Sequence, residues 1–232
     1  MGNRFRISSK PGKTLLWLWL KKDLSTMKGR VGVDLAGGSM LNKMFFRTEK
    51  YISVDINQVK LDEGLRKHPE AEAVNSPIMD YLDNLTNERP DVLVCVQTMG
   101  TNQFFDHSET YLTVEKMYDA LRPGGEMIFN VGDFGVDLDV MERKLSELLK
   151  GRFKSVKSRF YGAFHTGGGQ PRWEHKKGGI VKRINSSDLR KKSRLRAAIS
   201  LPVAYFMHLV PPLRSGFGLK KRKLYFCCRG KL

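Results

Sequence analysis

Hydrophobic and polar residues follow two rhythms along roughly the first 160 residues of the chain. Short apolar runs bounded by turn residues predict strands, and apolar residues repeated at three- and four-residue spacing predict helices. The predicted strands cover residues 30–36, 51–57, a short stretch ending near 76, 90–98, 126–132 and 153–162. The predicted helices cover residues 15–27, 39–46, 58–67, 111–121 and 138–149.

The run PDVLVCVQT at residues 90–98 is apolar almost throughout, as expected for a central parallel strand that is buried on both faces. Strands that alternate with helices predict an α/β fold, here a Rossmann-like, doubly wound and mostly parallel sheet. In such sheets, ligands bind beyond the carboxyl ends of the strands. We therefore expect the Gly37-Gly38 turn, Asp55 and Asp80 to lie along one rim of the sheet.

The alternation of predicted strands and helices ends after residue 161. A glycine-rich stretch leads into residues 188–214, where a basic block is followed by an apolar block, and strand character returns at 220–230. We predict an N-terminal helical segment (1–27), a core (28–161), a basic insertion (162–219) and a last strand of the core sheet (220–232). The sheet would then have seven strands, with the insertion before the last one.

Charge is distributed very unevenly along the chain. Apolar content of 41% is ordinary for a globular protein, but the net charge is +17. Residues 1–151 contain 20 Lys and Arg against 22 Asp and Glu, whereas residues 152–232 contain 21 against 2. This asymmetry indicates an anionic partner, either a nucleic acid or an acidic membrane surface.

The three cysteines, Cys95, Cys227 and Cys228, have a spacing that suits neither a disulfide framework nor a zinc site. We expect a reducing, cytoplasmic setting and no metal site. The stretch TLLWLWL at residues 14–20 is short and is followed by two lysines, so we expect no signal peptide. No apolar run approaches the roughly 20 residues that a membrane span needs.

The stretch VDLAGGSML at residues 33–41 ends a strand in a bare turn. Gly37 and Gly38 can adopt positive φ and have no Cβ to keep a ligand away from the backbone. The Lys-Ser/Thr of a phosphate-binding loop is missing, and the dinucleotide fingerprint fits poorly. The stretch therefore has two interpretations: a plain strand–helix connector, or a turn that contacts a ligand.

Asp55 ends the second predicted strand, 21 residues after Asp34. A carboxylate at this place can accept both hydroxyls of a ribose, and its alternative role is a helix cap or a solvated charge. Asp80, after the third strand, would accept an adenine amino group or cap the next turn.

Five segments together resemble the class I S-adenosylmethionine-dependent methyltransferases, and the resemblance covers roughly residues 28–160. These segments are, in order, VGVDLAGGSML, YISVDIN, NSPIMDYL, PDVLVCVQTMG and ALRPGGEMIFNVG. The chain is most similar to the group that acts on small molecules, sugars and lipid-linked intermediates. It departs from the family pattern at Ala36, where a glycine is usual, and at Met40, which would narrow the methionine end of the pocket.

The resemblance implies S-adenosylmethionine as the cofactor and assigns a role to each matching residue. These residues are Asp34 for the turn and the methionine amino group, the backbone of Ala36, Gly37 and Gly38 along the cofactor, Asp55 for the ribose, Ile56 for packing on adenine, Asp80 and Tyr81 at the adenine edge, and Gln97 near the departing methyl group.

Methyl transfer from a sulfonium depends largely on positioning, and a hydroxyl acceptor also benefits from a general base. His107, in the loop after the fourth predicted strand, is the candidate base, and Asp106 competes with it. The alternative for His107 is a surface loop residue.

Residues 188–214 support three interpretations: a segment at an anionic membrane surface, a lid packed on the domain, or an RNA-binding element. Trp17 and Trp19, followed by two lysines, would join the membrane face. We predict methyl transfer to an oxygen, less readily to nitrogen or carbon, of a small-molecule, glycan or lipid-linked acceptor. The alternatives are an RNA methyltransferase and a non-catalytic nucleotide-binding or membrane-docking module.

Overall fold

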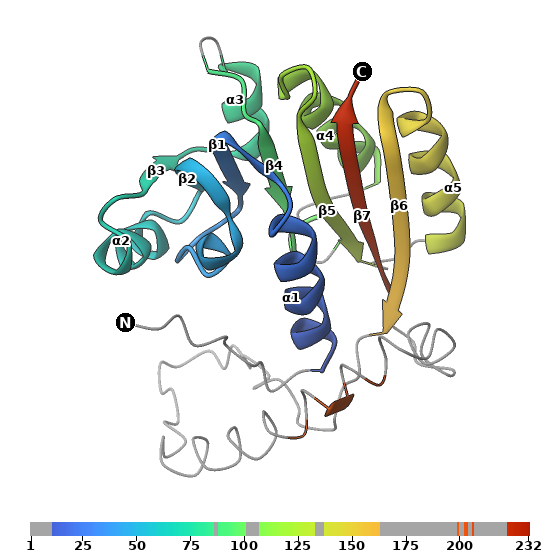
Figure 1. The fold of residues 1–232 in the computed structure, drawn as a ribbon, viewed down its shortest axis with the longest axis horizontal. Helices are drawn as coiled ribbons and strands as arrows, with labels where there is room; N and C mark the ends of the chain where they lie inside the picture. Colours follow the sequence, from blue (N-terminus) through green and yellow to red (C-terminus); the bar gives the residue numbers. More distant parts are fainter. Residues whose placement is uncertain are drawn as a thin grey trace, which may run out of the picture.

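The computed structural model describes residues 11–85, 88–100, 107–132, 137–162 and 222–232, together with Ile199, Pro202, Val203 and Phe206. Within these residues the chain forms a seven-stranded sheet in the order β3-β2-β1-β4-β5-β7-β6 (Figure 1). The strands are β1 (Lys28–Leu35), β2 (Arg47–Asp55), β3 (Glu72–Asn75), β4 (Val92–Cys95), β5 (Glu126–Gly132), β6 (Phe153–Gly162) and β7 (Arg222–Lys231).

The first five strands pair in parallel, and β7 runs antiparallel to both of its neighbours. This arrangement confirms the predicted doubly wound, mostly parallel sheet, including a last strand that follows the 162–219 stretch. The order reverses at β1, which has β2 on one side and β4 on the other. A doubly wound sheet binds its ligands beside such a reversal.

The helices are α1 (Pro11–Leu24), α2 (Gln58–Lys67), α3 (Ile78–Asp83), α4 (His107–Ala120) and α5 (Leu138–Leu149), with a 3₁₀ turn η1 (Lys43–Phe45). The predicted helix at 39–46 is wrong, because only η1 forms there. Ala36, Gly38 and Met40 all have positive φ, and the turn they make occupies the residues where that helix would begin. The six-residue helix α3 was not predicted, since it is too short to show a clear periodicity.

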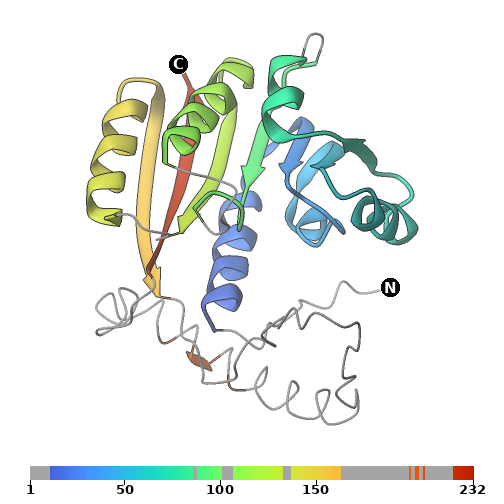
Figure 2. The ribbon, with the colours of Figure 1, turned by 180° about the vertical axis from the view of Figure 1, so that it is seen from behind.

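Alternate residues of the strands face two hydrophobic cores, one on each side of the sheet. Leu93 and Cys95 face the core that α3, α4 and α5 cover, which is the side seen in Figure 2. Val92 and Val94 face the core that α1 completes on the other side. Burial on both faces is the property that the apolar run 90–98 predicted.

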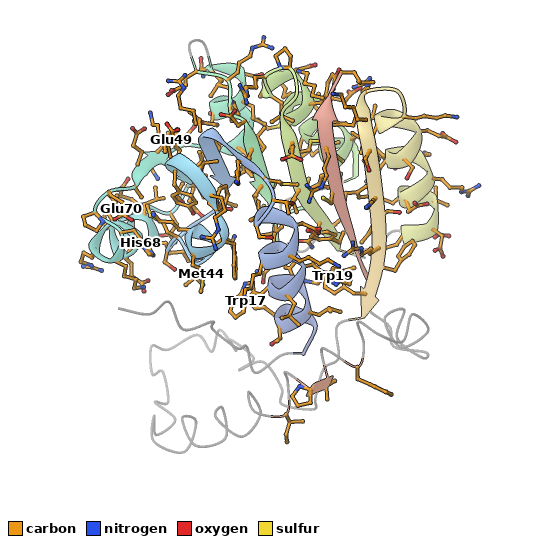
Figure 3. All side chains as sticks on the ribbon, in the orientation of Figure 1. Trp17, Trp19, Met44, Glu49, His68 and Glu70 are labelled. Carbon is orange, nitrogen blue, oxygen red and sulfur yellow. The ribbon has the colours of Figure 1, made fainter. Side chains whose placement is uncertain are left out.

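Helix α1 belongs to the core, and its tryptophans are not available for a membrane face. Trp17 and Trp19 lie on α1, which crosses in front of the sheet (Figure 3), and their exposed fractions are 6% and 1%. The Trp19 ring lies 5.4 Å from that of Tyr161 and 5.3 Å from that of Tyr225. The Tyr225 hydroxyl donates to Asp23 at the end of α1 (2.9 Å). Each indole therefore buries its large apolar area against the sheet.

Four residues of the 188–214 block are described, and all four are helical. Val203 packs against the core that α1 completes, whereas Ile199 and Phe206 are largely exposed. In the described part of the chain, no helix combines the length and the apolar character that crossing a bilayer requires.

Asp91 joins three strands at the amino edge of the sheet. Its Oδ2 accepts hydrogen bonds from the backbone N–H groups of Arg30 (2.9 Å) and Val31 (2.8 Å), and its carboxylate pairs with the Arg122 guanidinium. Its carbonyl accepts the N–H of Glu126 at the start of β5 (2.8 Å). A Cβ on Gly29 would lie 2.3 Å from the Asp91 Cβ, so the strand start must be glycine. This edge is therefore closed by internal bonds, and the carboxyl edge is left for a ligand.

Replacing Asp91 by alanine is expected to lower the free energy of unfolding by about 2–4 kcal/mol, because two backbone donors and a guanidinium lose their acceptor. Urea unfolding followed by circular dichroism measures the loss. Asp83→Ala, which removes only an exposed carboxylate paired with Lys116, is the matched control and should cost less than about 1 kcal/mol. Equal losses for the two variants would contradict the role assigned to Asp91.

Candidate cofactor site

The turn after β1 contains three left-handed residues in five positions. Ala36, Gly38 and Met40 have φ of 55°, 49° and 59°. For Ala36 and Met40 this conformation costs about 1–2 kcal/mol each. The turn is tied to β2 by the bond from the Gly37 N–H to the Val54 carbonyl (3.1 Å). A strained turn beside the point where the strand order reverses is where a ligand site is expected.

The Met40 side chain fills core space under α2 and not the methionine end of a pocket, so that expectation is corrected. Met40 is 1% exposed, and a Cβ on Gly64 of α2 would lie 2.6 Å from its Cγ. The absence of a side chain at Gly64 lets the helix lie directly on Met40. The strained backbone at Met40 turns its side chain inward. In the same turn Gly38 is buried, whereas Gly37 and Ser39 are partly exposed.

Asp34 holds this turn from inside. Its Oδ2 accepts from the Tyr51 hydroxyl (2.8 Å), and the Asn42 amide reaches both carboxylate oxygens (3.2 and 3.3 Å). Burial raises the pKa of Asp34 to about 7, against the opposing effect of these two hydrogen bonds. Because Asp34 is fully buried, it lacks the exposed surface through which it would reach a methionine amino group.

Asp55 lies next to the glycine turn, as the sequence led us to expect. A Cβ built on Gly38 would lie 3.3 Å from Asp55 Oδ2 and 3.4 Å from the Lys60 Cδ, so Asp55 and Lys60 pack closely on the bare backbone of this residue. Asp55 Oδ1 accepts the Asn57 N–H (2.8 Å), which orients the carboxylate toward the turn. The aliphatic chain of Lys60, an otherwise exposed residue, packs at the same place, with its Cβ 3.8 Å from that built atom.

Two apolar side chains stand in solvent beside Asp55. Ile56 is 74% exposed and Val59, in the first turn of α2, is 75% exposed. Exposed aliphatic surface next to a carboxylate suits the face of an aromatic ring carried on a sugar. Val59 was missed by the sequence reasoning, although an isolated apolar residue on the polar side of a predicted helix is a usable sign.

Asp80 and Tyr81 both lie on α3. Asp80 is exposed, and its carbonyl accepts from the Asn84 backbone and side chain. Tyr81 packs against the core, and burial raises its pKa to about 12. The charges that also affect Tyr81 are Lys50 on β2, Glu72 at the start of β3 and Glu88 before β4. Of the two predicted residues, Asp80 is exposed, whereas Tyr81 is partly buried against the core.

Gln97 follows β4 with φ of 65°, and its N–H donates to Asn130 Oδ1 (2.6 Å). The ladder places Leu35 beside Cys95 at the ends of β1 and β4. Ala36 and Gln97 thus follow two neighbouring central strands, and both have the unfavourable left-handed backbone conformation. Asn130, on β5, was not predicted, because nothing local in EMIFNVG marks it as a partner of Gln97.

The remaining expectations fall partly outside the described residues. Helix α4 begins at His107, whose side chain lies outside them, as does all of Asp106. The 162–219 insertion also lies outside, apart from Gly162, whose backbone ends β6, and the four residues named above. Among the described residues, no cluster of three histidines, cysteines or carboxylates is arranged to hold a metal ion.

Asp34 should make the stability of the protein depend on pH. Since its pKa rises from 3.8 to about 7 on folding, its stabilising effect is fully present below about pH 4 and is lost as pH rises to about 7. The loss amounts to about 4 kcal/mol at most. Asp34→Asn should remove this dependence in urea unfolding at pH 4 to 8, whereas the exposed control Asp83→Asn should keep it. Parallel curves for wild type and Asp34→Asn would refute the raised pKa.

No family model matches the sequence, and no curated protein matches it. Solved structures do. The N-methyltransferase NodS from Bradyrhizobium japonicum WM9 aligns with a TM-score of 0.54 and 11% identity over 95% of this chain and 98% of that chain. The structure of NodS in complex with S-adenosyl-L-homocysteine aligns with a TM-score of 0.51 and 14% identity, over 66% of this chain and 81% of that chain.

The plantazolicin methyltransferase BamL, in complex with a triazolic desmethylPZN analog and S-adenosyl-L-homocysteine, aligns with a TM-score of 0.52 and 8% identity. The alignment covers 97% of this chain and 86% of that chain. At such low identities the likeness concerns the fold. The chain therefore has the fold of the class I S-adenosylmethionine-dependent methyltransferases, as its sequence led us to expect.

Proposed function

We propose that the protein is an S-adenosylmethionine-dependent methyltransferase. The observation that carries the proposal is the closeness of Asp55 to the Gly38 turn, where a Cβ built on Gly38 would lie 3.3 Å from Asp55 Oδ2, at the reversal point of a class I methyltransferase fold. NodS and BamL, which share this fold, are both known with S-adenosyl-L-homocysteine. The same position in this chain offers a carboxylate and a bare backbone side by side, which is what a nucleoside with an amino-acid tail requires.

Each part of the cofactor has a matching group in this proposal. Asp55 accepts the ribose hydroxyls, Ile56 and Val59 cover one face of adenine, and Asp80 accepts its amino group. The backbone of the Ala36–Gly38 turn lines the path toward Gln97. When bound, the cofactor supplies an electrophilic methyl group, and the chain's contribution is to orient the two reactants and exclude water.

The acceptor is proposed to be an oxygen, or less readily a nitrogen or carbon, of a small molecule, glycan or lipid-linked compound. BamL is a plantazolicin methyltransferase, which supports a small-molecule acceptor, and NodS is an N-methyltransferase, which supports nitrogen as an acceptor atom. His107, at the start of α4, is the proposed general base, with Asp106 as its competitor. An RNA acceptor is the second candidate, favoured by the 21 Lys and Arg against 2 Asp and Glu after residue 151.

We also propose a cytoplasmic protein that binds the inner face of an anionic membrane. Ile199 and Phe206 are 56% and 59% exposed while Val203, between them, faces the core. In sequence they follow the basic block Arg190–Arg196. Exposed apolar side chains beside basic residues are typical of segments that lie at an anionic bilayer surface.

Asp55→Ala should weaken the binding of S-adenosyl-L-homocysteine by about 10-fold or more, because the ribose hydroxyls lose a charged acceptor. Isothermal titration calorimetry measures the change. Asp62→Ala, on the exposed side of α2, is the matched control and should bind like wild type. Unchanged affinity in Asp55→Ala would remove the main support for the proposed function.

The double variant Ile199→Glu/Phe206→Glu should no longer float with phosphatidylserine-containing vesicles, because two exposed apolar side chains become charged. Leu112→Glu, at an exposed position of α4, is the control and should float like wild type. Flotation of the double variant at the wild-type level would refute this membrane contact. Loss of flotation in both variants would show that it depends on net charge alone.

The acceptor itself is found by incubating the protein with methyl-labelled cofactor and separate lipid, glycan and RNA fractions. Label in the lipid or glycan fraction supports the proposed acceptor class, and label in RNA supports the second candidate. Cofactor binding with no label in any fraction would favour a non-catalytic module.

A further inference from the structure

We infer that Asn130 is a positioning residue, which holds the backbone of Gln97 in its left-handed conformation and so directs the chain that leaves β4 toward the cofactor. The inference deepens the proposed function and rests on it for the step from geometry to turnover. Its geometric part concerns only residues of β4, β5 and the segment between Cys95 and Gly100.

The contact joins a strained backbone to a rigid strand. Gln97 has φ of 65°, a conformation that a residue with a side chain keeps only where its surroundings enforce it. Asn130 is fully buried on β5, and its Oδ1 accepts the Gln97 N–H at 2.6 Å. The acceptor is thus a side chain that cannot move away, and the N–H that it fixes belongs to the strained residue.

A second contact with β5 holds the same segment at Met99 and Gly100. The Gly132 N–H donates to the Met99 carbonyl (3.0 Å), and a Cβ on Gly100 would lie 2.6 Å from the Gly132 oxygen. The regular β4–β5 ladder ends at Cys95 and Phe129. Beyond it, the segment from Gln97 to Gly100 is held by the end of β5 at two points, of which only the first depends on a side chain.

Stability alone does not account for an asparagine at this position. The Asn130 Nδ2 is buried without a hydrogen-bond partner, and such a group lowers stability. The cross-strand neighbour Tyr225 does not use it, since the Tyr225 hydroxyl donates to Asp23. A leucine, which has the same branched skeleton with two methyl groups, would avoid this cost. What leucine lacks is the acceptor for the Gln97 N–H, so that acceptor is the function of the residue.

The strain and the bond lie at the proposed reaction site. Gln97 follows the central strand next to Ala36, at the point where the sheet order reverses. A displacement of the backbone here would move the groups that surround the departing methyl group. Geometry at this position affects transfer more than it affects folding.

The first test needs neither cofactor nor acceptor. In Asn130→Leu, amide hydrogen exchange of the Gln97 N–H should accelerate by about 10-fold or more. The thermal midpoint should fall no further than in Thr113→Val, because the lost acceptor is offset by removal of the unpaired Nδ2. The control is Thr113→Val, which also replaces a fully buried polar residue but on α4, away from this contact. It should leave the exchange of the Gln97 N–H unchanged. Wild-type exchange of Gln97 in Asn130→Leu, or a fall in its midpoint larger than in Thr113→Val, would overturn the inference.

The second test measures the consequence at the site. Asn130→Leu should weaken S-adenosyl-L-homocysteine binding by about 10-fold, and the loss should shrink to about threefold or less when Gln97 is glycine, because glycine adopts positive φ without help. Equal losses in the two backgrounds would show that Asn130 does not act through Gln97. If wild type itself fails to bind, the proposed function fails, and the exchange result still decides the geometric part. Should Asn130→Leu not fold, Asn130→Asp, which keeps an acceptor oxygen, must preserve Gln97 protection.

Discussion

The candidate site depends on one enclosed carboxylate. Asp34, the last residue but one of β1, lies inside the protein, and Tyr51 on β2 and Asn42 after the turn both donate to it. These bonds join the strand, its neighbour and the far side of the turn, so the intervening residues must pass through left-handed conformations. Without that anchor, an alanine and a methionine would not hold positive φ, and the turn would not bring Gly38 close to Asp55.

The stabilising contacts of Asp91 lie at the amino edge of the sheet, and the strained backbone lies at the carboxyl edge. At the amino edge, Asp91 satisfies backbone donors of β1 and pairs with Arg122. At the carboxyl edge, a carboxylate is buried and Ala36, Met40 and Gln97 keep unfavourable backbone conformations. The two cores and the amino edge offset these costs, which is the arrangement expected where a fold keeps one edge preorganised for a ligand.

Asp34 and Asp55 show how position decides what a carboxylate does. They lie at the ends of adjacent strands, yet Asp34 is enclosed by donors whereas Asp55 keeps one oxygen beside the open turn. Asp34 belongs to the structure of the site, and Asp55 is available to a ligand. The resemblance to methyltransferases assigned ligand contacts to both, and only the surroundings of each distinguish them.

The sequence by itself determined the order of the strands, the bounds of α2, α5, β5 and β6, and the place of Asp55 beside the glycine turn. These follow from local periodicity and from the rule that parallel strands end at one edge. Tertiary structure alone decided the burial of Trp17 and Trp19, the inward side chain of Met40, the packing of Tyr81 and the bond from Gln97 to Asn130. Each of these depends on residues distant in sequence that a fold brings together, and no local pattern records which neighbour a side chain will meet.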